Sequence, residues 1–260
     1  MSQRVVMSEA GREAIPALRS GTVGGWKGAV RQGSIALLLL GLAACSELPA
    51  SVTGKVPVDC IGLVDLDKDN VKGKWTKDDS GALKTTTSPF GRVQVPYIPS
   101  DEYDVKITAQ RTGSVVDALV VGLVKGGNEF AVIIDGATKA TATGIDKFDG
   151  KSFTDNDLAQ KKTFFTDKAS NITISVRNTS FNINIDGNDI LTWKDKVKEK
   201  DKDGKEVEKE TGKPLDYGRC TLIPEWKNPI GKCIFLGAFS EYTVSTFQII
   251  NQSKGGRYLR

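Results

Sequence analysis

The sequence contains no histidine among its 260 residues, and this absence excludes more chemistry than any other feature of the composition. Without histidine there is no Ser-His-Asp or Cys-His nucleophile system, no imidazole general acid or base, and no histidine-ligated metal. Any catalysis would have to rest on carboxylates, Lys, Tyr or Arg. We predict neither a cofactor nor a metal site.

The sequence also lacks an excess of charge of one sign over most of its length. It has 36 Lys and Arg against 32 Asp and Glu, a formal net charge of +4. Residues 1–44 alone carry a net charge of +3, so the rest of the chain is almost neutral. Because a nucleic-acid-binding domain normally has a basic field, we expect no nucleic-acid partner.

Cysteine is scarce, with four residues and no C-x-x-C pair of the kind that predicts a zinc site. Cys220 and Cys233 lie in neighbouring segments, so we expect them to form a disulfide in an oxidising compartment. Cys60 would then be free. Pairing of Cys60 with either of the other two is the alternative.

An apolar run at residues 35–44 follows a positively charged stretch and precedes small residues, which is the arrangement of a secretory signal peptide. The run is too short to span a bilayer, which takes about 20 residues. Leu42-Ala43-Ala44-Cys45 resembles the lipobox of bacterial lipoproteins, in which the cysteine is lipidated.

We therefore expect residues 1–44 to be a signal peptide, Cys45 to carry a lipid, and residues 45–58 to form a tether. The lipid would anchor the protein to a membrane of the bacterial cell envelope. An ordinary cleaved signal, which would leave the protein secreted and soluble, is the alternative.

From residue 59 onward the sequence has the alternation of apolar and polar residues that is typical of half-buried strands, for example at 103–109, 172–176 and 181–185. Short runs at 119–124, 130–134 and 234–239 are apolar on both faces. Asp186-Gly187 and Gly126-Gly127 favour hairpin turns, and the phase change at Ser245-Thr246 predicts a β-bulge. One short helix is expected at 155–162.

Many short strands separated by turns predict an all-β domain over residues 59–260, built as a two-sheet antiparallel jelly-roll sandwich. Its core residues would be the apolar members of the clearest strands. These are Val105, Ile107, Val132, Ile174, Val176, Ile183, Ile185 and Phe235.

Residues 194–213 interrupt the strand pattern with eight Lys and seven acidic residues. Because the charges alternate in sign and few side chains are apolar, we interpret this insertion as a solvated loop or a frayed helical hairpin. A specific docking site is the alternative.

Candidate ligand-binding residues lie in two loops. Asp155-Asn156-Asp157 contains paired carboxylates, which glycosidases use as acid and base or nucleophile; turn and cap residues are the alternative. Trp226 and Tyr217 follow the insertion and are candidate platforms for sugar rings, with packing in the core as the alternative. Asp65, Asp67 and Asp69 invite a calcium-loop interpretation, but the Gly and Glu of an EF-hand are missing.

Several short motifs, taken in order along the chain, resemble secreted bacterial domains of the concanavalin A-like lectin/glucanase superfamily. They are Gly73-Lys74-Trp75, Gly81-Ala82-Leu83, residues 92–97, residues 102–107, Asp155-Asn156-Asp157, Val176-Arg177, Ile185-Asp186-Gly187 and Phe235-Leu236-Gly237. Within the superfamily the sequence is most similar to uncharacterised relatives of the keto-disaccharide hydrolase-like domain.

This resemblance covers roughly residues 60–250 and implies a jelly roll that binds or hydrolyses carbohydrate. The chain departs from the superfamily in the charged insertion and lacks the E-x-D-x-x-E pattern of its glucanases, so no catalytic residue is carried over. The prediction is a surface-tethered, non-catalytic lipoprotein that binds a polysaccharide or peptidoglycan-type ligand. A carboxylate-dependent glycoside-processing enzyme and a structural lipoprotein without a small ligand are the alternatives.

Overall fold

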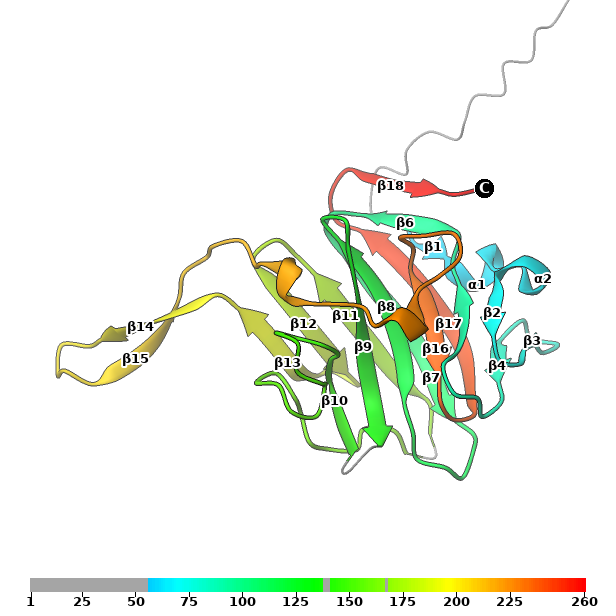
Figure 1. The fold of residues 1–260 in the computed structure, drawn as a ribbon, viewed down its shortest axis with the longest axis horizontal. Helices are drawn as coiled ribbons and strands as arrows, with labels where there is room; N and C mark the ends of the chain where they lie inside the picture. The colour runs from blue at the N-terminus through cyan, green and yellow to red at the C-terminus, as the bar shows by residue number, and fades with distance from the viewer. Residues whose placement is uncertain (1–55, 138–140, 167) are drawn as a thin grey trace, which may run out of the picture. The chain divides into compact units, whose positions relative to one another are not determined.

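The computed structural model describes residues 56–137, 141–166 and 168–260, and most of the regular structure in them is β-strand. Two antiparallel sheets hold most of the strands (Figure 1). The eight-stranded sheet contains β1 (Val58–Asp59), β3 (Trp75–Lys77), β4 (Leu83–Thr85), β7 (Tyr103–Arg111), β11 (Ser170–Val176), β12 (Ser180–Ile185), β13 (Asn188–Lys194) and β17 (Tyr242–Asn251). The six-stranded sheet contains β2 (Asn70–Lys72), β5 (Gly91–Gln94), β8 (Leu119–Lys125), β9 (Asn128–Ala137), β10 (Thr141–Ile145) and β16 (Phe235–Ala238).

The smaller elements are two-stranded pairs and single helical turns. The pairs are β6 (Tyr97–Ser100) with β18 (Gly255–Tyr258), and β14 (Lys196–Lys200) with β15 (Glu206–Glu210). The helices are α1 (Cys60–Leu63), α2 (Leu66–Asp69), and two 3₁₀ turns, η1 (Tyr217–Arg219) and η2 (Pro224–Trp226).

One continuous apolar core joins the inner faces of the two large sheets. It contains alternate residues of each strand, such as Leu119 and Val121 of β8 and Ile172 and Ile174 of β11. All eight core residues predicted from the sequence are at most 4% exposed, but only seven lie in this core, and Phe235 lies in a second apolar cluster on the outer face of the six-stranded sheet. The predicted fold class, an all-β antiparallel sandwich of two sheets, is confirmed.

The turn and bulge predictions are also confirmed. Asp186 (φ 50°) and Gly187 (φ 83°) connect β12 to β13, and both central residues have the positive φ of a type I′ turn. Gly126 and Gly127 connect β8 to β9 in the same way. The register of β17 against β7 shifts between Val244 and Thr246, where the pattern changes phase.

Two sequence predictions need correction here. Residues 155–162 form turns and a single bridge at Gln160, not the expected helix, because the carboxyamide of Asn156 bonds to the backbone and holds a turn. Val58, expected to end the tether, pairs with Ile249 of β17 and is buried. Residues 1–55, which include the predicted signal peptide, Cys45 and most of the predicted tether, lie outside the described residues.

The charged insertion is a β-hairpin, and not the loop or helical hairpin that we expected. β14 and β15 pair only with each other, and every residue in both strands is exposed. Lysines of β14 face glutamates of β15, with ion pairs Lys196–Glu208 at 3.0 Å and Lys198–Glu206 at 3.6 Å. Opposite charges across an antiparallel pair stabilise it slightly, so an alternating Lys/Glu sequence can form a hairpin in water.

Every residue of β14 and β15 is exposed, and among the described residues the one ion pair between the hairpin and the sandwich, Glu210 to Lys194 of β13, is exposed too. Removal of the hairpin should therefore leave the sandwich intact. Replacing residues 196–210 by a short Gly-Ser linker should cost less than about 1 kcal/mol, since exposed ion pairs contribute little. That loss corresponds to at most about 4 °C in Tm for a domain of this size. Differential scanning calorimetry checks it, and a fall of about 10 °C, more than twice that limit, would mean that the hairpin packs on the domain.

Candidate functional site

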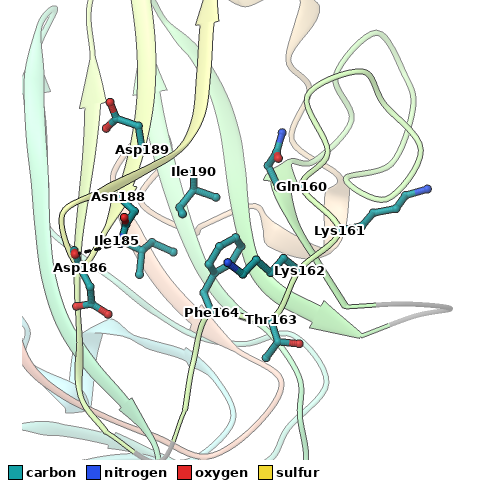
Figure 2. Close-up of a pocket in the computed structure, with 10 residues that line it drawn as sticks. All are labelled: Gln160, Lys161, Lys162, Thr163, Phe164, Ile185, Asp186, Asn188, Asp189 and Ile190. Carbon is teal, nitrogen blue, oxygen red and sulfur yellow. Dashed lines mark hydrogen bonds between the residues drawn. The ribbon is translucent and has the colours of Figure 1, made fainter.

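A surface cleft of about 490 Å³ lies between edge elements of the two large sheets (Figure 2). One wall is the segment 160–164, where Gln160 pairs with Thr143 of the edge strand β10. The other wall is the turn of the β12–β13 hairpin, residues 185–190. Its volume is in the range of small-molecule and sugar-sized sites.

The cleft has an apolar centre and a polar rim. Figure 2 shows Phe164, Ile185 and Ile190 gathered between the two walls, while Lys161 points outward. The rim carries amide, carboxylate and ammonium groups from Gln160, Lys161, Asp186, Asn188 and Asp189. The Lys162 ammonium lies over the Phe164 ring, with Nζ 5.8 Å from its centroid. An aromatic face beside several hydrogen-bonding groups can hold the apolar face of a sugar ring and its hydroxyls at once.

The carboxylates of the hairpin wall are held in place by short hydrogen bonds. Asp186 Oδ1 accepts the backbone N–H of Asn171 at 2.7 Å, which ties the turn to β11. Asp189 Oδ1 accepts from the Asn184 side chain at 2.8 Å. Both Asp side chains remain exposed, so each has lone pairs free for a ligand.

The Phe164 wall is fixed by a buried carboxylate, Asp135. In β9 two residues, Ile134 and Asp135, stand opposite the single residue Thr143 of β10, and Asp135 has a φ of 54°. This bulge turns the Asp135 side chain away from the normal alternation. Its carboxylate accepts the N–H of Phe164 at 2.8 Å and of Phe165 at 2.7 Å, and Arg111 lies 3.8 Å away. Burial raises the pKa of Asp135.

The outer face of the six-stranded sheet carries a second apolar cluster, centred on Trp226. It contains strand residues whose neighbours in sequence face the main core, among them Val120, Ile133 and Phe235. The segment 221–232, drawn in orange in Figure 1, crosses this face. Trp226 stacks on Phe235 with centroids 5.6 Å apart and is 1% exposed. Trp226 is therefore not an exposed platform, and the alternative interpretation, packing in the core, fits the geometry, because the sheet face beneath it is apolar and needs cover.

A second cavity of about 240 Å³ remains at the edge of this cluster. Aromatic residues, including Phe90, Phe153, Trp226 and Phe239, form much of its lining, and Asp117 and Asp146 contribute its carboxylates. Asp146 is 7% exposed. Burial raises the pKa of Asp146, although the backbone N–H groups of Lys147 and Phe153 and the charge of Lys147 oppose the shift.

This raised pKa gives a testable pH dependence. A carboxyl with a higher pKa in the folded state contributes stability below its unfolded pKa, near 3.8, and loses it as pH rises through the folded pKa. Asp146→Asn has no such titration. Urea unfolding at pH 7 and at about pH 4 should show the variant gaining stability relative to the wild type at the higher pH. A constant difference would contradict this.

The Asp155-Asn156-Asp157 segment is a turn, and the structure separates its three side chains. Asn156 is 6% exposed and donates to the carbonyls of Ile145 and Ser152 at 2.8 and 2.9 Å. Asp155 accepts from Ser152, and Asp157 lies 3.9 Å from Lys151. These three residues do not line the cleft. Their alternative interpretation, turn and cap residues, fits the geometry.

Tyr217 is also a core residue and not an exposed platform. It is 4% exposed, its ring packs against Trp193 at 5.2 Å, and its hydroxyl donates to the Arg177 carbonyl at 2.9 Å. Burial raises its pKa. Buried Tyr residues normally need such a partner for the hydroxyl, and here the strand end at Arg177 supplies it.

The expected Cys220–Cys233 disulfide is absent, because both residues are free, buried thiols. Cys220 pairs with Phe148 through a backbone bridge, and Cys233 follows the segment that crosses the six-stranded sheet. The two cysteines thus lie at opposite ends of that segment. Burial raises the pKa of each thiol to about 12. Cys60 is free and buried as well.

The residues of the cleft were not among the candidates named from the sequence. Asp186 was recognised as a turn residue and as part of a resemblance motif, but not as a ligand-binding residue, and Phe164 lies in a stretch without periodicity. A hairpin turn with one carboxylate in it, Asp186, and a second one shortly after it, Asp189, was the one available signal. Over the described residues, no cluster of three or more potential metal ligands occurs, and no helix there is long and apolar enough to cross a membrane.

The sequence matches no protein-family model and no curated protein. Among solved structures, it is similar to a Crh5 transglycosylase in complex with NAG, with 13% identity, 76% of this chain and 84% of that chain covered, and a TM-score of 0.46. Carbohydrate-binding module CBM66 from Bacillus subtilis has 8% identity, with 72% of this chain and 93% of that chain covered, and a TM-score of 0.36. The VIP36 exoplasmic/lumenal domain has 7% identity, with 76% of this chain and 88% of that chain covered, and a TM-score of 0.42. Similarity at this level does not bear on what this protein binds.

Proposed function

We propose that this protein binds a glycan polymer, without cleaving it, at the cleft between Phe164 and the β12–β13 hairpin. The observation that carries the proposal is the composition of the cleft. An aromatic ring and two isoleucines form its centre, and amides, carboxylates and ammonium groups surround them. A hydroxyl-rich ring with one apolar face satisfies both parts of such a site.

The outer face of the eight-stranded sheet supports a polymeric ligand over a single sugar. A row of polar residues crosses five neighbouring strands and ends at the cleft residue Asp189. In order it is Gln248, Lys106, Thr173, Asn184 and Asp189. None of the five is buried. Five strands spaced about 4.8 Å apart give a platform roughly 19 Å wide, long enough for several sugar units.

Binding is favoured over hydrolysis in the cleft because Asp186 and Asp189, its two carboxylates, are exposed. A general acid normally works from a shielded site, where its pKa is raised. The second candidate function, a carboxylate-dependent glycosidase, is favoured by one observation elsewhere. Asp146, whose pKa is raised by burial, shares the smaller cavity with Asp117.

The test measures binding to insoluble polysaccharides and peptidoglycan, and the release of reducing ends. Asp189→Ala should weaken binding about tenfold, the effect of one charged hydrogen bond, and Phe164→Ala should weaken it further. Asp157→Ala, a matched exposed carboxylate outside the cleft, should not change it. Binding without product and with this mutational pattern supports the proposal.

Other results would overturn it. Turnover that Asp146→Asn abolishes would establish the enzyme instead. No binding to any polysaccharide would leave the structural lipoprotein as the better interpretation.

We also propose that a lipid on Cys45 holds the protein at a membrane of the cell envelope. The support is the signal-peptide pattern that ends in Leu42-Ala43-Ala44-Cys45. When the full chain is expressed in a bacterium, Cys45→Ala should move it to the soluble fraction and abolish labelling by a fatty-acid analogue. Cys60→Ala, at a buried thiol, should leave the labelling unchanged. Labelling that persists in Cys45→Ala would contradict the anchor.

A further inference from the structure

The smaller cavity, on the outer face of the six-stranded sheet, combines aromatic walls with buried negative charge. Phe90, Trp226 and Phe239 contact one another edge to face, with centroids 5.1 to 5.5 Å apart. Phe153 completes the aromatic lining, and Asp117 and Asp146 add carboxylates. Aromatic rings attract cations to their faces, so both features of this lining favour a positively charged occupant.

Asp146 is the more deeply buried of the two carboxylates, so its ionised form would attract a cation in the cavity through less water. Its carboxylate accepts two backbone N–H groups. No ion pair within the described part of the chain involves it. Burying a carboxylate without a cationic partner costs free energy. A cation in the cavity would offset this cost.

The cavity is also preorganised by a strained residue. Phe90 has a φ of 58°, a conformation that is unfavourable for a bulky side chain. Such strain persists where the surrounding structure enforces it, and it is concentrated at functional sites. The same ring already attracts a cation of the chain itself, since Lys72 Nζ lies 5.5 Å from its centroid. Lys72 does not line the cavity.

We propose that this cavity binds a small organic ammonium ion, with the cationic head between the aromatic rings and Asp146. The volume of about 240 Å³ is below the range for drug-sized ligands, so the ligand has few non-hydrogen atoms. This site shares no lining residue with the glycan cleft. The two proposals therefore stand or fall separately.

The first experiment compares two probes of nearly the same shape on the unmodified protein by isothermal titration calorimetry. Choline carries the quaternary ammonium, and 3,3-dimethyl-1-butanol replaces its nitrogen by carbon. Choline should bind saturably and at least about tenfold more tightly than the alcohol, the effect of a desolvated cation–aromatic contact. Equal affinities, or no binding of choline at millimolar concentrations, would overturn the proposal.

The second experiment locates the site. Asp146→Asn keeps the shape of the side chain and removes its charge, and it should weaken choline binding at least about tenfold while leaving the alcohol unaffected. The control is Asp157→Asn, which makes the same charge change on an exposed side chain of the loop that contains Phe153. Choline binding that is equally strong in both variants would show that the site is not this cavity. The comparison of probes on the unmodified protein needs no variant to fold.

Discussion

Replacing Trp226 by alanine should lower the free energy of unfolding by about 3–5 kcal/mol, the usual cost of removing a large aromatic side chain from a core. Trp226 is 1% exposed and packs against Phe90, Phe235 and Phe239. It also lies directly on Gly237, where an added Cβ would be 2.7 Å from Cζ3 of the indole. The vacated space is bounded by a rigid sheet, which cannot collapse to fill it.

Urea unfolding followed by circular dichroism measures this loss. Trp226→Phe should cost less, because it keeps one ring on the sheet. Glu225→Ala, next to it and exposed, should change stability by no more than about 0.5 kcal/mol. If Trp226→Ala retained full stability and lost only polysaccharide binding, Trp226 would be a binding platform and not a core residue.

Replacing Asp135 by alanine should cost about 3–5 kcal/mol, because it removes one partner of a buried charged network. The change leaves the N–H groups of Phe164 and Phe165 without an acceptor and Arg111, whose side chain is 13% exposed, without its counter-ion. Alanine is also strained at a φ of 54°. Since Asp135 fixes the Phe164 wall, the cleft should lose its shape as well.

Hydrogen exchange distinguishes this effect from general destabilisation. In Asp135→Ala the amides of Phe164 and Phe165 should lose protection before those of β11 and β12. In Asp135→Asn, asparagine tolerates a positive φ and its amide oxygen can still accept a hydrogen bond. This variant should therefore lose less stability than Asp135→Ala. Asp157→Ala, an exposed carboxylate 3.9 Å from Lys151, should be neutral within about 0.5 kcal/mol. A loss below about 1 kcal/mol in Asp135→Ala would contradict the buried network.

The alternation of apolar residues predicted the sandwich and its inner core correctly because period 2 directly records which side of a strand is buried. Val105, Ile107, Ile174 and Ile183 face the core for this reason. The turn at Asp186-Gly187 was equally predictable, since the type I′ turn requires positive φ at both positions.

The candidate site was not predictable in the same way. The sequence left open whether Trp226 is a platform for sugar rings or a core residue. The structure buries it, because the outer face of the six-stranded sheet is apolar at Val120, Ile133 and Phe235. Sequence shows that such strands are apolar on both faces, but not which segment covers the second face. The prediction of a Cys220–Cys233 disulfide was wrong for a related reason. Two cysteines that are near in sequence need not be near in space.

The sequence by itself thus determined the class of fold, the inner core, the hairpin turns and the exclusion of histidine chemistry, because each depends on local periodicity, local backbone geometry or composition. Only the tertiary structure decided that the charged insertion pairs with itself, that Trp226 and Tyr217 are buried, and that Phe164 faces the β12–β13 turn. It also decided that Asp146 lies among aromatic rings. These features depend on contacts between segments far apart in the chain, and no local pattern records which segments will meet.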